Sequence, residues 1–338
     1  MAKINIKGVK MQKIYDIGLV PRKTEMAERF MFPFSQINYL LNGGEFDRVT
    51  LITSSTDNGK STIASQIICD IIKQGWNCCC FFGEDTPYES QDRIFKQSIY
   101  GNDDSLVYKT YQVNGKDTNV AEWCLTEKAF EEAREKFAGK LFLYNTNASA
   151  KVDEILEGFD EAREKYGCRV FLLDNCDQFD FSSDNENKAM KDIIIKIRDY
   201  AINHKVHIFL ISHIRKLESG KILPSLDDVK GTSSIVNIAK NVLIVVRMDK
   251  VDHESKEYKS LKRLIELNNY NLDDADSLVY VAKTKGRKLG FACLKYNRRT
   301  NTYYDCKKIN EKTEESERAT VIAPKVELQE VIDVDLPF

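Results

Sequence analysis

The stretch RVTLITSSTDNGKSTIASQ, from Arg48 to Gln66, is the part of this chain that says most about its fold. The β-branched run from Val49 to Thr53 is typical of a buried strand, a loop of small polar residues follows it, and an apolar-periodic helix opens at or near Lys60. A strand, a loop and a helix in this order are the context in which the residues Gly-Lys-Ser form a phosphate-binding loop. The stretch therefore predicts a P-loop, with an ordinary strand-to-helix turn as the alternative.

The loop residues predict how a nucleoside triphosphate is held. Backbone N–H groups are expected to surround the β-phosphate, the Lys60 ammonium to reach the β- and γ-oxygens, and the Ser61 hydroxyl to bind Mg²⁺. The pattern departs from the usual G-x-x-x-x-G-K-[ST] at its first position, where Ser54 replaces glycine. The predicted nucleotide-binding residues of the loop are Ser55, Thr56, Asp57, Asn58, Gly59, Lys60, Ser61 and Thr62.

Length and composition allow one α/β core with extensions. The chain has 338 residues, 42% of them hydrophobic, and a net charge of -2, so no global basic field attracts nucleic acid. None of the nine cysteines forms a C-x-x-C pair, and Cys78 to Cys80 lie in an apolar run, which indicates reduced thiols in a cytoplasmic protein. No segment resembles a secretory signal or approaches the roughly 18 apolar residues of a membrane span, so we expect a soluble protein without a membrane partner.

Pattern changes divide the chain into three parts. Residues 1–42 form a lead-in, where Lys23 to Phe30 can make a short amphipathic helix and an apolar strip from Phe32 to Leu41 is expected to pack on this chain's own sheet or on a neighbouring subunit. Residues 43–306 alternate strand and helix, which predicts a mostly parallel sheet flanked by helices on both faces. Residues 307–338 are rich in Glu and Lys without periodicity and are predicted to be disordered.

The expected elements follow from periodicity and turn residues. Helices are expected over 60–74, from Pro87 onward, and over 119–137, 152–166 and 186–204. Strands are expected over 49–53, 77–83, 141–144, 169–174, 206–212, 241–247, 278–283 and 290–296, with Tyr303 in a last edge pairing. Residues 248–276 are expected to form a partly helical surface insertion without assigned chemistry.

Two carboxylates close strands that are expected to lie near the P-loop strand. The run VFLLD ends in Asp174, which is placed to hold the water shell of Mg²⁺ beside the P-loop serine. In FFGEDTP, Glu84 is expected to orient the attacking water, and Asp85 is the rival for that role. Capping of the helix that begins at Pro87 is the alternative for both residues.

Polar residues also close the strand IFLISH and the segment that follows it. His213 can hydrogen-bond the γ-phosphate and report its loss to the adjoining loop, although a lone histidine is more often structural. Arg215 and Lys216 come next. The segment DDVKGTSS then combines small hydrogen-bond donors with Lys230, which suits a loop that grips a phosphate backbone without reading bases.

The order of these motifs resembles the RecA-type core of the DnaB-like replicative ring helicases. The resemblance runs from about residue 36 to 305 through GGE, TSSTDNGKST, FFGEDTP, FLLDN, LISH, DDVKGTSS, VAKTKGRKLG and LKYNRRTNTYYD, and it is greatest to the phage primase-helicase and Twinkle branch, without a primase part. It implies a RecA-like P-loop NTPase fold, ATP or another NTP with Mg²⁺, a homo-oligomeric ring that is most often hexameric, and single-stranded DNA as partner.

The resemblance also implies roles for single residues. Lys60 and Ser61 bind phosphate and Mg²⁺, Asp174 is the Walker B carboxylate, Glu84 is the catalytic base and His213 is the γ-phosphate sensor. Arg247 and Tyr296 match the pair that sandwiches the base, as a cation and an aromatic face can do. The segment Lys23 to Phe30 matches the linker helix that docks on the next subunit. The implied DNA-binding residues are Arg215, Lys230, Gly231, Thr232 and Ser233.

The chain departs from this family near its predicted trans-acting finger. Family members place a lysine and, two residues later, an arginine that reaches the γ-phosphate of the neighbouring subunit, whereas this chain has Lys283 and Lys285. Either Lys285 substitutes with weaker bidentate geometry, or Arg287 takes over, and we favour Arg287.

The last residues, VIDVDLPF, form an acidic run that ends in Phe338. They are similar to the acidic tips with which bacterial single-stranded DNA-binding proteins recruit partners. An ordinary frayed tail is the favoured interpretation, and a contact with a replisome partner is the alternative.

The leading functional interpretation is a phage-encoded, ATP-dependent replicative DNA helicase that hydrolyses NTP at subunit interfaces and translocates on single-stranded DNA. Several copies of the Lys230 loop around a channel would concentrate positive charge that a single chain lacks. The alternatives are a RecA-type recombination mediator that forms filaments on DNA, and a binding module that uses nucleotide as a switch. Retention of Glu84 argues against the switch.

Overall fold

The computed structural model describes residues 28–99, 102–113, 116–144, 151–176, 179, 186–217, 221–230, 233–285 and 287–309. Within these ranges nine strands form one sheet in the order β13-β12-β11-β10-β3-β9-β8-β4-β7. The strands from β10 to β7 run parallel, and β11, β12 and β13 add an antiparallel edge. The strand bounds are β3 Arg48–Ser54, β4 Cys78–Phe82, β7 Leu141–Leu143, β8 Val170–Asp174, β9 His207–His213, β10 Asn241–Arg247, β11 Ser277–Thr284, β12 Gly290–Asn297 and β13 Thr302–Asp305.

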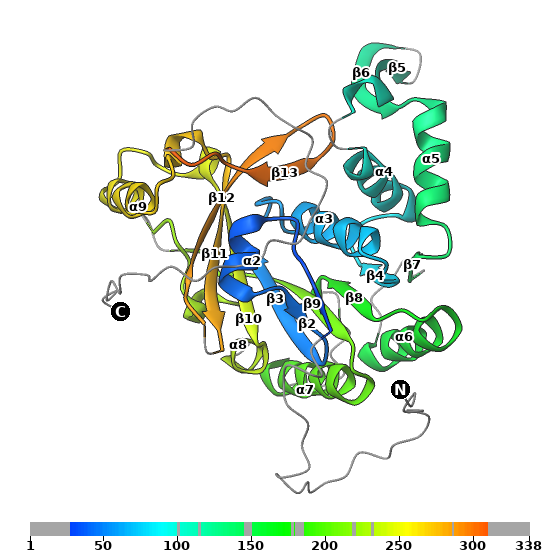
Figure 1. Cartoon of the computed structure of the whole chain (residues 1–338), viewed down its shortest axis with the longest axis horizontal. Coiled ribbons are helices and arrows are strands. Elements are labelled where there is room, and N and C mark those ends of the chain that lie inside the picture. Colours follow the sequence, from blue (N-terminus) through cyan, green and yellow to red (C-terminus); the bar gives the residue numbers. More distant parts are fainter. Residues whose placement is uncertain are drawn as a thin grey trace, which may run out of the picture.

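Helices cover both faces of this sheet (Figure 1). Alternate side chains of each central strand face opposite sides. Leu51 belongs to the buried cluster that includes α6, α7 and α8, whereas Ile52 belongs to the cluster that includes α2, α3, α4 and α5. The helix bounds are α2 Ser35–Leu41, α3 Lys60–Lys73, α4 Pro87–Ser98, α5 Glu127–Phe137, α6 Val152–Tyr166, α7 Glu186–His204 and α8 Ser233–Ile238. The predicted mostly parallel α/β architecture is confirmed.

The apolar strip of the lead-in packs on this chain's own sheet. Phe32, Phe34 and the apolar residues of α2 belong to the same buried cluster as α3. Strand β1, Arg29–Phe30, pairs with β2, Gly44–Glu45, and a side chain at Gly44 would collide with the Phe30 ring at 1.9 Å. The helix predicted over Lys23 to Phe30 is therefore wrong at its end, because Arg29 and Phe30 gain a strand partner, and residues 23–27 lie outside the described part.

The helix predicted over 119–137 is also wrong in its first half. Residues Lys116–Leu125 form strand β6, which pairs antiparallel with β5, Leu106–Val113, a strand that periodicity did not indicate. The helix α5 begins only after Thr126, whose hydroxyl accepts a hydrogen bond from the Ala129 N–H at 3.2 Å. Cross-strand pairing overrides the helical pattern here, as the packing of the Tyr108 ring 5.1 Å from that of Trp123 illustrates.

The predicted insertion contains one further helix, α9, Lys256–Leu267, between short 3-10 turns. Tyr258, Leu261 and Ile265 anchor it on the core.

Among the described residues, no helix combines the length and apolar character that crossing a bilayer would need. All nine cysteines are free thiols, and the three on β4 are buried, where desolvation raises the thiol pKa. They fit the predicted reduced core.

Candidate nucleotide-binding site

Five strand ends assemble the site at one edge of the sheet. Strands β4, β8, β9, β3 and β10 all present their carboxyl ends there, because all five run parallel. The register sets Ser54 of β3 opposite His213 of β9, and Phe82 of β4 opposite Asp174 of β8. Residues predicted from four separate segments are therefore brought together, as expected for the open edge of a parallel sheet.

The P-loop lies between β3 and α3. Gly59 has φ +80°, and a side chain there would meet the Tyr303 hydroxyl at 2.4 Å, so both the backbone and the space require glycine. Ser54 is absent from the positive-φ residues, which shows that the first position of the motif needs no glycine here. Its hydroxyl donates to the Ser55 carbonyl oxygen at 2.6 Å and accepts from Lys60 Nζ at 3.3 Å.

Asn58 shapes the loop in a way that sequence reasoning missed. The side chain is buried, its Nδ2 donates to the carbonyl oxygens of Ser55 at 3.2 Å and Thr56 at 3.1 Å, and its Oδ1 accepts from the Arg247 backbone N–H at 2.9 Å. The amide thus joins the P-loop to the end of β10. The loop composition predicted a contact with phosphate, and gave no signal for this bracing role.

Asp174 is buried beside the first turn of α3. Burial raises its pKa to about 6, and a hydrogen bond from the Ser61 hydroxyl acts in the opposite direction. A buried carboxylate next to a serine hydroxyl suits Mg²⁺, which accepts few protein ligands and takes the rest from water and phosphate. No group of three or more acidic, histidine or cysteine residues forms a closed metal cage within the described ranges. The donor set therefore fits Mg²⁺ held jointly with a nucleotide.

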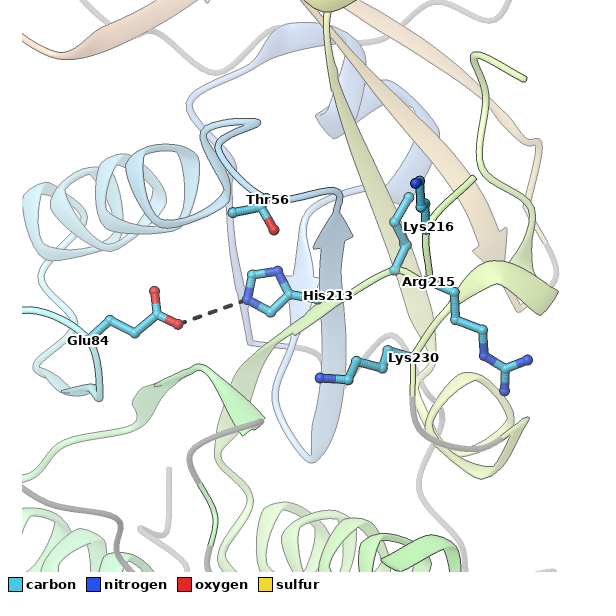
Figure 2. A pocket seen from close by; sticks show the side chains of 7 residues that line it. Thr56, Glu84, His213, Arg215, Lys216 and Lys230 are labelled. Atoms are coloured by element: carbon cyan, nitrogen blue, oxygen red, sulfur yellow. Dashed lines mark ion pairs between the residues drawn. The ribbon is translucent and has the colours of Figure 1, made fainter. Parts of the chain in front are cut away.

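Glu84 and Asp85, the two candidates for the general base in FFGEDTP, have different surroundings in the structure. Glu84 lines the cavity, where its Oε1 accepts from Asn175 Nδ2 at 2.6 Å and lies 4.0 Å from His213 Nε2 (Figure 2). Asp85 instead pairs with Arg93 at 2.5 Å. Neither residue caps α4, because Thr86 does so in a reciprocal box with Glu89.

His213 contacts both the P-loop, through Lys60, and the end of β8, through Asn175. Its Nδ1 lies 3.2 Å from Lys60 Nζ, and its Nε2 lies 3.2 Å from Asn175 Nδ2. Both ring nitrogens face nitrogen donors, and a neutral imidazole can accept from only one of them. An anionic oxygen between His213 and Lys60 would accept from both, so the geometry suits a γ-phosphate. Asn175 was missed at the sequence level, although it directly follows Asp174.

The predicted base-binding pair is only partly in place. Arg247 lines the cavity, is held by Asp249 through contacts of 3.0 and 2.5 Å, and donates to the Asp57 carbonyl oxygen at 3.3 Å. Tyr296 lies outside the residues that line this cavity, and its ring packs 4.7 Å from that of Tyr303. The sandwich role of this pair remains a prediction.

The finger candidates lie away from the site of their own chain. Lys283 is engaged within the subunit, because its Nζ donates to the carbonyl oxygens of Val236, Asn237 and Ala239 at 2.5, 3.1 and 2.9 Å. Lys285 and Arg287 do not line the cavity. Lysine binding to the last carbonyls of a helix is a known form of cap, here on α8.

The predicted DNA-binding residues lie along a neighbouring cavity. Arg215 and Lys230 line it together with Glu84 and His213. Gly231 and Thr232 lie outside the described residues, and Ser233 is the first residue of α8. The nucleotide cavity itself has a volume of about 310 Å³ and is lined by Thr56, Asp57, Asn58, Gly59, Lys60, Ser61, Thr62, Glu84, Asp174, Asn175, His213 and Arg247. Ser55 is absent from this lining and contributes its carbonyl oxygen to Lys60 at 3.1 Å.

A P-loop at the end of a central parallel strand, with a buried carboxylate beside its serine, defines a nucleotide-binding protein of the RecA-like P-loop class. The sequence profile of the AAA domain family matches residues 19–219, more than half of the chain, and the protein belongs to this family.

Solved structures share the fold. One of them, an ATPase domain, has 13% identity and a TM-score of 0.62, with 81% of this chain and 90% of that chain covered. A DnaB-like replicative helicase, whose structure is described with its interactions with primase, has 14% identity and a TM-score of 0.64, over 84% of this chain and 66% of that one. A KaiC-like protein from the hyperthermophilic archaeon Pyrococcus horikoshii OT3 has 15% identity and a TM-score of 0.53, over 83% and 100%.

These similarities confirm the predicted RecA-like fold and the predicted likeness to DnaB-like helicases at the level of the fold. A search among curated proteins found no significant match.

Proposed function

We propose that this protein is a phage-encoded, ATP-dependent DNA helicase that works in the cytoplasm as a hexameric ring on single-stranded DNA. The observation that carries the proposal is the connected set Glu84, Asn175, His213 and Lys60, which lines the P-loop cavity together with Asp174. A nucleotide switch has no need of a carboxylate placed in this way, whereas a motor that hydrolyses ATP requires one.

The proposed chemistry is hydrolysis of the terminal phosphoanhydride. Water attacks the γ-phosphorus while the bond to the oxygen that bridges the β- and γ-phosphates breaks, and Glu84 accepts a proton from the water, so that ADP and inorganic phosphate form. Lys60 and His213 would donate hydrogen bonds to the γ-oxygens as charge develops. Ser61 and Asp174 would hold Mg²⁺, which supplies neutralisation of phosphate charge.

Backbone contacts support a route from this chemistry to DNA. The Lys230 N–H donates to the His213 carbonyl oxygen at 2.9 Å, and the Arg215 N–H donates to the Asp228 carbonyl oxygen at 2.7 Å. The strand end that would sense the γ-phosphate is thus paired with the segment that leads into residues 231–233. In the proposal this loop grips the DNA backbone with Arg215 and Lys230 and moves when phosphate is lost.

The proposal assigns Lys285 or Arg287 to the active site of the neighbouring subunit. The absence of both residues from the cavity of their own chain supports this assignment. Arg287→Gln is expected to abolish DNA-stimulated ATP hydrolysis while nucleotide binding is kept, and Lys285→Gln serves as the matched variant. Unchanged turnover in both variants would exclude an intersubunit finger from this hairpin.

A forked-duplex unwinding assay with ATP, together with negative-stain images, tests the whole proposal. Rings and ATP-dependent strand separation are expected from the wild type, and neither strand separation nor turnover from Glu84→Gln. Filaments on DNA without unwinding would favour the recombination-mediator alternative, and nucleotide binding without turnover would favour the switch.

A replisome partner is proposed for the acidic end of the chain, which lies outside the described residues. Deletion of Asp335 to Phe338 is expected to weaken retention of a polymerase, primase or loader in a pull-down while ATPase activity is unchanged. Equal retention by the full-length and truncated chains would remove this part of the proposal.

A further inference from the structure

Helix α9 presents a basic face to solvent at the periphery of the molecule (Figure 1). Tyr258, Leu261 and Ile265 are buried against the core, so the residues on the opposite side of the helix point outward. Four exposed residues, three or four positions apart, follow this outer side and are called the α9 stripe: Lys256, Ser260, Arg263 and Leu267. The stripe therefore carries two cations and no acid.

The acids of α9 leave the two cations of the stripe accessible. Glu257 is turned inward, where its carboxylate accepts from the backbone N–H groups of residues 222 and 223 at 2.9 and 3.1 Å. Glu266 is exposed and flanks the stripe. Within the described ranges neither Lys256 nor Arg263 forms an ion pair. An additional anionic segment can therefore pair with both.

The last described residue, Ile309, lies at one end of the stripe. Its N–H donates to the carbonyl oxygen of Asn269, two residues after Leu267, at 2.8 Å. Leu267 is 83% exposed and Ile309 is 55% exposed, so this junction is open to a further segment. The chain thus continues into residues 310–338, which lie outside the described part, directly beside the carboxyl end of α9.

The sequence that follows this junction is acidic. The run EKTEESE, from Glu311 to Glu317, has four glutamates and one lysine, and therefore a formal charge of -3. The distance along α9 from Asn269 back to Lys256 is about 20 Å at 1.5 Å per residue, and the eight residues 310–317 span up to about 27 Å when extended. The run is therefore long enough to pass both cations of the stripe.

We propose that the acidic run from Glu311 to Glu317 binds the α9 stripe of its own chain, with its glutamates paired to Arg263 and Lys256. Single exposed pairs are weak, but a tether of a few residues keeps the run at an effective concentration in the millimolar range. A nucleic-acid backbone is the other anion that suits a basic helix face. The run at the end of the stripe favours the chain's own segment, because every copy carries it there.

Cross-linking of the full-length protein tests the contact. A carbodiimide joins a lysine amine directly to a carboxylate that touches it, and is expected to link Lys256 to a glutamate of the acidic run. The Lys259–Glu254 pair, with a distance of 3.0 Å, is the internal standard. Links of the run to residues 307 and 308 alone would show local pairing and overturn the inference. In a mixture of ¹⁴N- and ¹⁵N-labelled protein, links that join only differently labelled chains would overturn it as well.

A charge reversal on the stripe provides the matched comparison. Arg263→Glu replaces an attraction by a repulsion between exposed charges, and should lower the yield of the Lys256 link about five-fold. Arg134→Glu lies on α5 at the other side of the molecule (Figure 1), where the side chain is 64% exposed, and should keep the wild-type yield. An equal yield in both variants would refute the contact.

Limited trypsin digestion measures the same contact without a cross-linker. Binding of the acidic run should protect the cleavage sites after Lys312 and Arg318, so Arg263→Glu should speed cleavage there about five-fold. Cleavage after Lys325, beyond the run, should stay as in wild type. Equal rates in wild type and Arg263→Glu at all three sites would contradict the proposal.

Binding of a single-stranded oligonucleotide, followed by fluorescence polarisation, separates the two anions. Loss of oligonucleotide affinity in Arg263→Glu, with cross-linking and cleavage unchanged, would assign the stripe to nucleic acid and overturn the inference. The inference does not depend on ATP hydrolysis. A protein without ATP turnover would refute the helicase proposal and leave the contact standing, whereas unwinding by a protein whose acidic run never links to α9 would refute the contact alone.

Discussion

Strand β9 carries a histidine at each end, and the two rings lie in opposite environments. His207 at the amino end is fully buried, with the Phe30 and Phe209 rings 4.9 and 4.6 Å away. Its Nδ1 donates to the Glu45 carbonyl oxygen at 2.7 Å, and its Nε2 has no hydrogen-bond partner among the described residues. Burial lowers the pKa of His207 to about 4, so this ring is neutral at physiological pH.

His213 at the carboxyl end is partly exposed and lines both cavities. Its two ring nitrogens contact the side-chain nitrogens of Lys60 and Asn175. One strand thus buries a histidine in the core at one end and places a histidine in the cavity lining at the other. The difference arises because Phe30 of β1 and Glu45 of β2 contact His207 at the amino end of β9. The carboxyl ends of the parallel strands lead into loops that leave polar groups accessible.

The largest predicted effect is on ATP turnover, which should depend on residues at the carboxyl ends of the parallel strands and not on residues at their amino ends. Glu84→Gln should lower ATP turnover about 100-fold or more, the usual effect of losing a general base, and leave the unfolding midpoint unchanged because this side chain is 61% exposed. Glu45→Gln at the opposite edge should do the reverse, since Glu45 pairs with Arg29 and Lys240 and lines neither cavity. Steady-state ATPase assays and thermal unfolding of both variants provide the check.

The second prediction concerns how stability depends on pH, to which the buried groups His207 and Asp174 contribute in opposite directions. The folded-state pKa of His207 is about 4, below the ordinary 6.5, so its contribution to stability is present above pH 6.5 and is lost as pH falls toward 4. The folded-state pKa of Asp174 is about 6, above the ordinary 3.8, so its contribution is present below pH 3.8 and is lost as pH rises through 6. The two contributions oppose each other between pH 4 and 6.

Single substitutions should therefore change the pH dependence in opposite directions. Relative to wild type, Asp174→Asn should make the protein less stable in acid and more stable at pH 7, and His207→Phe should remove part of the acid sensitivity. Each change is of the order of 3 kcal/mol across the window. Urea unfolding at closely spaced pH values measures it, and parallel curves for all three proteins would show that neither group is buried as described.

The third prediction concerns the hydrogen bonds through which Asn58 connects the P-loop to the end of β10. Asn58→Ala removes two donated hydrogen bonds and leaves the Arg247 N–H without its acceptor, at a cost of about 2 kcal/mol. Because the P-loop loses its shape, nucleotide affinity should fall along with stability. A fluorescent nucleotide titration and urea unfolding test this, with Asn58→Asp as the variant that keeps the acceptor. An affinity loss without destabilisation would make Asn58 a direct ligand.

The smallest predicted effect lies in the antiparallel edge. Lys283→Met leaves three carbonyl groups at the end of α8 without their donor, at a cost of about 1 kcal/mol. Nucleotide affinity should stay as in wild type, and oligonucleotide affinity should fall, because α8 follows the loop proposed to bind DNA. Lys283→Arg should restore both properties. Unchanged stability in the Met variant would show that Lys283 does not cap α8.

Local patterns predicted most of this molecule. The helix bounds over 152–166 and 186–204 follow periodicity, because each helix buries one face. The strand over 241–247 follows its continuous apolar run, because it is buried on both faces. The hairpin of β5 and β6 was not predicted, because its stability depends on cross-strand pairs that cannot be read from a single segment. The same reason hid the roles of Asn58 and Asn175, whose partners are distant in sequence.

Local sequence patterns were enough to predict the P-loop, the parallel sheet and the candidates Lys60, Glu84, Asp174 and His213, because hydrophobic periodicity and glycine mark where strands end and helices begin. Tertiary structure alone decided which carboxylate faces the cavity, that Asp85 pairs with Arg93, and that Lys283 caps α8. These choices depend on distances between segments that the chain order leaves open. The register of the strands and the pairing of buried charged groups determine these distances.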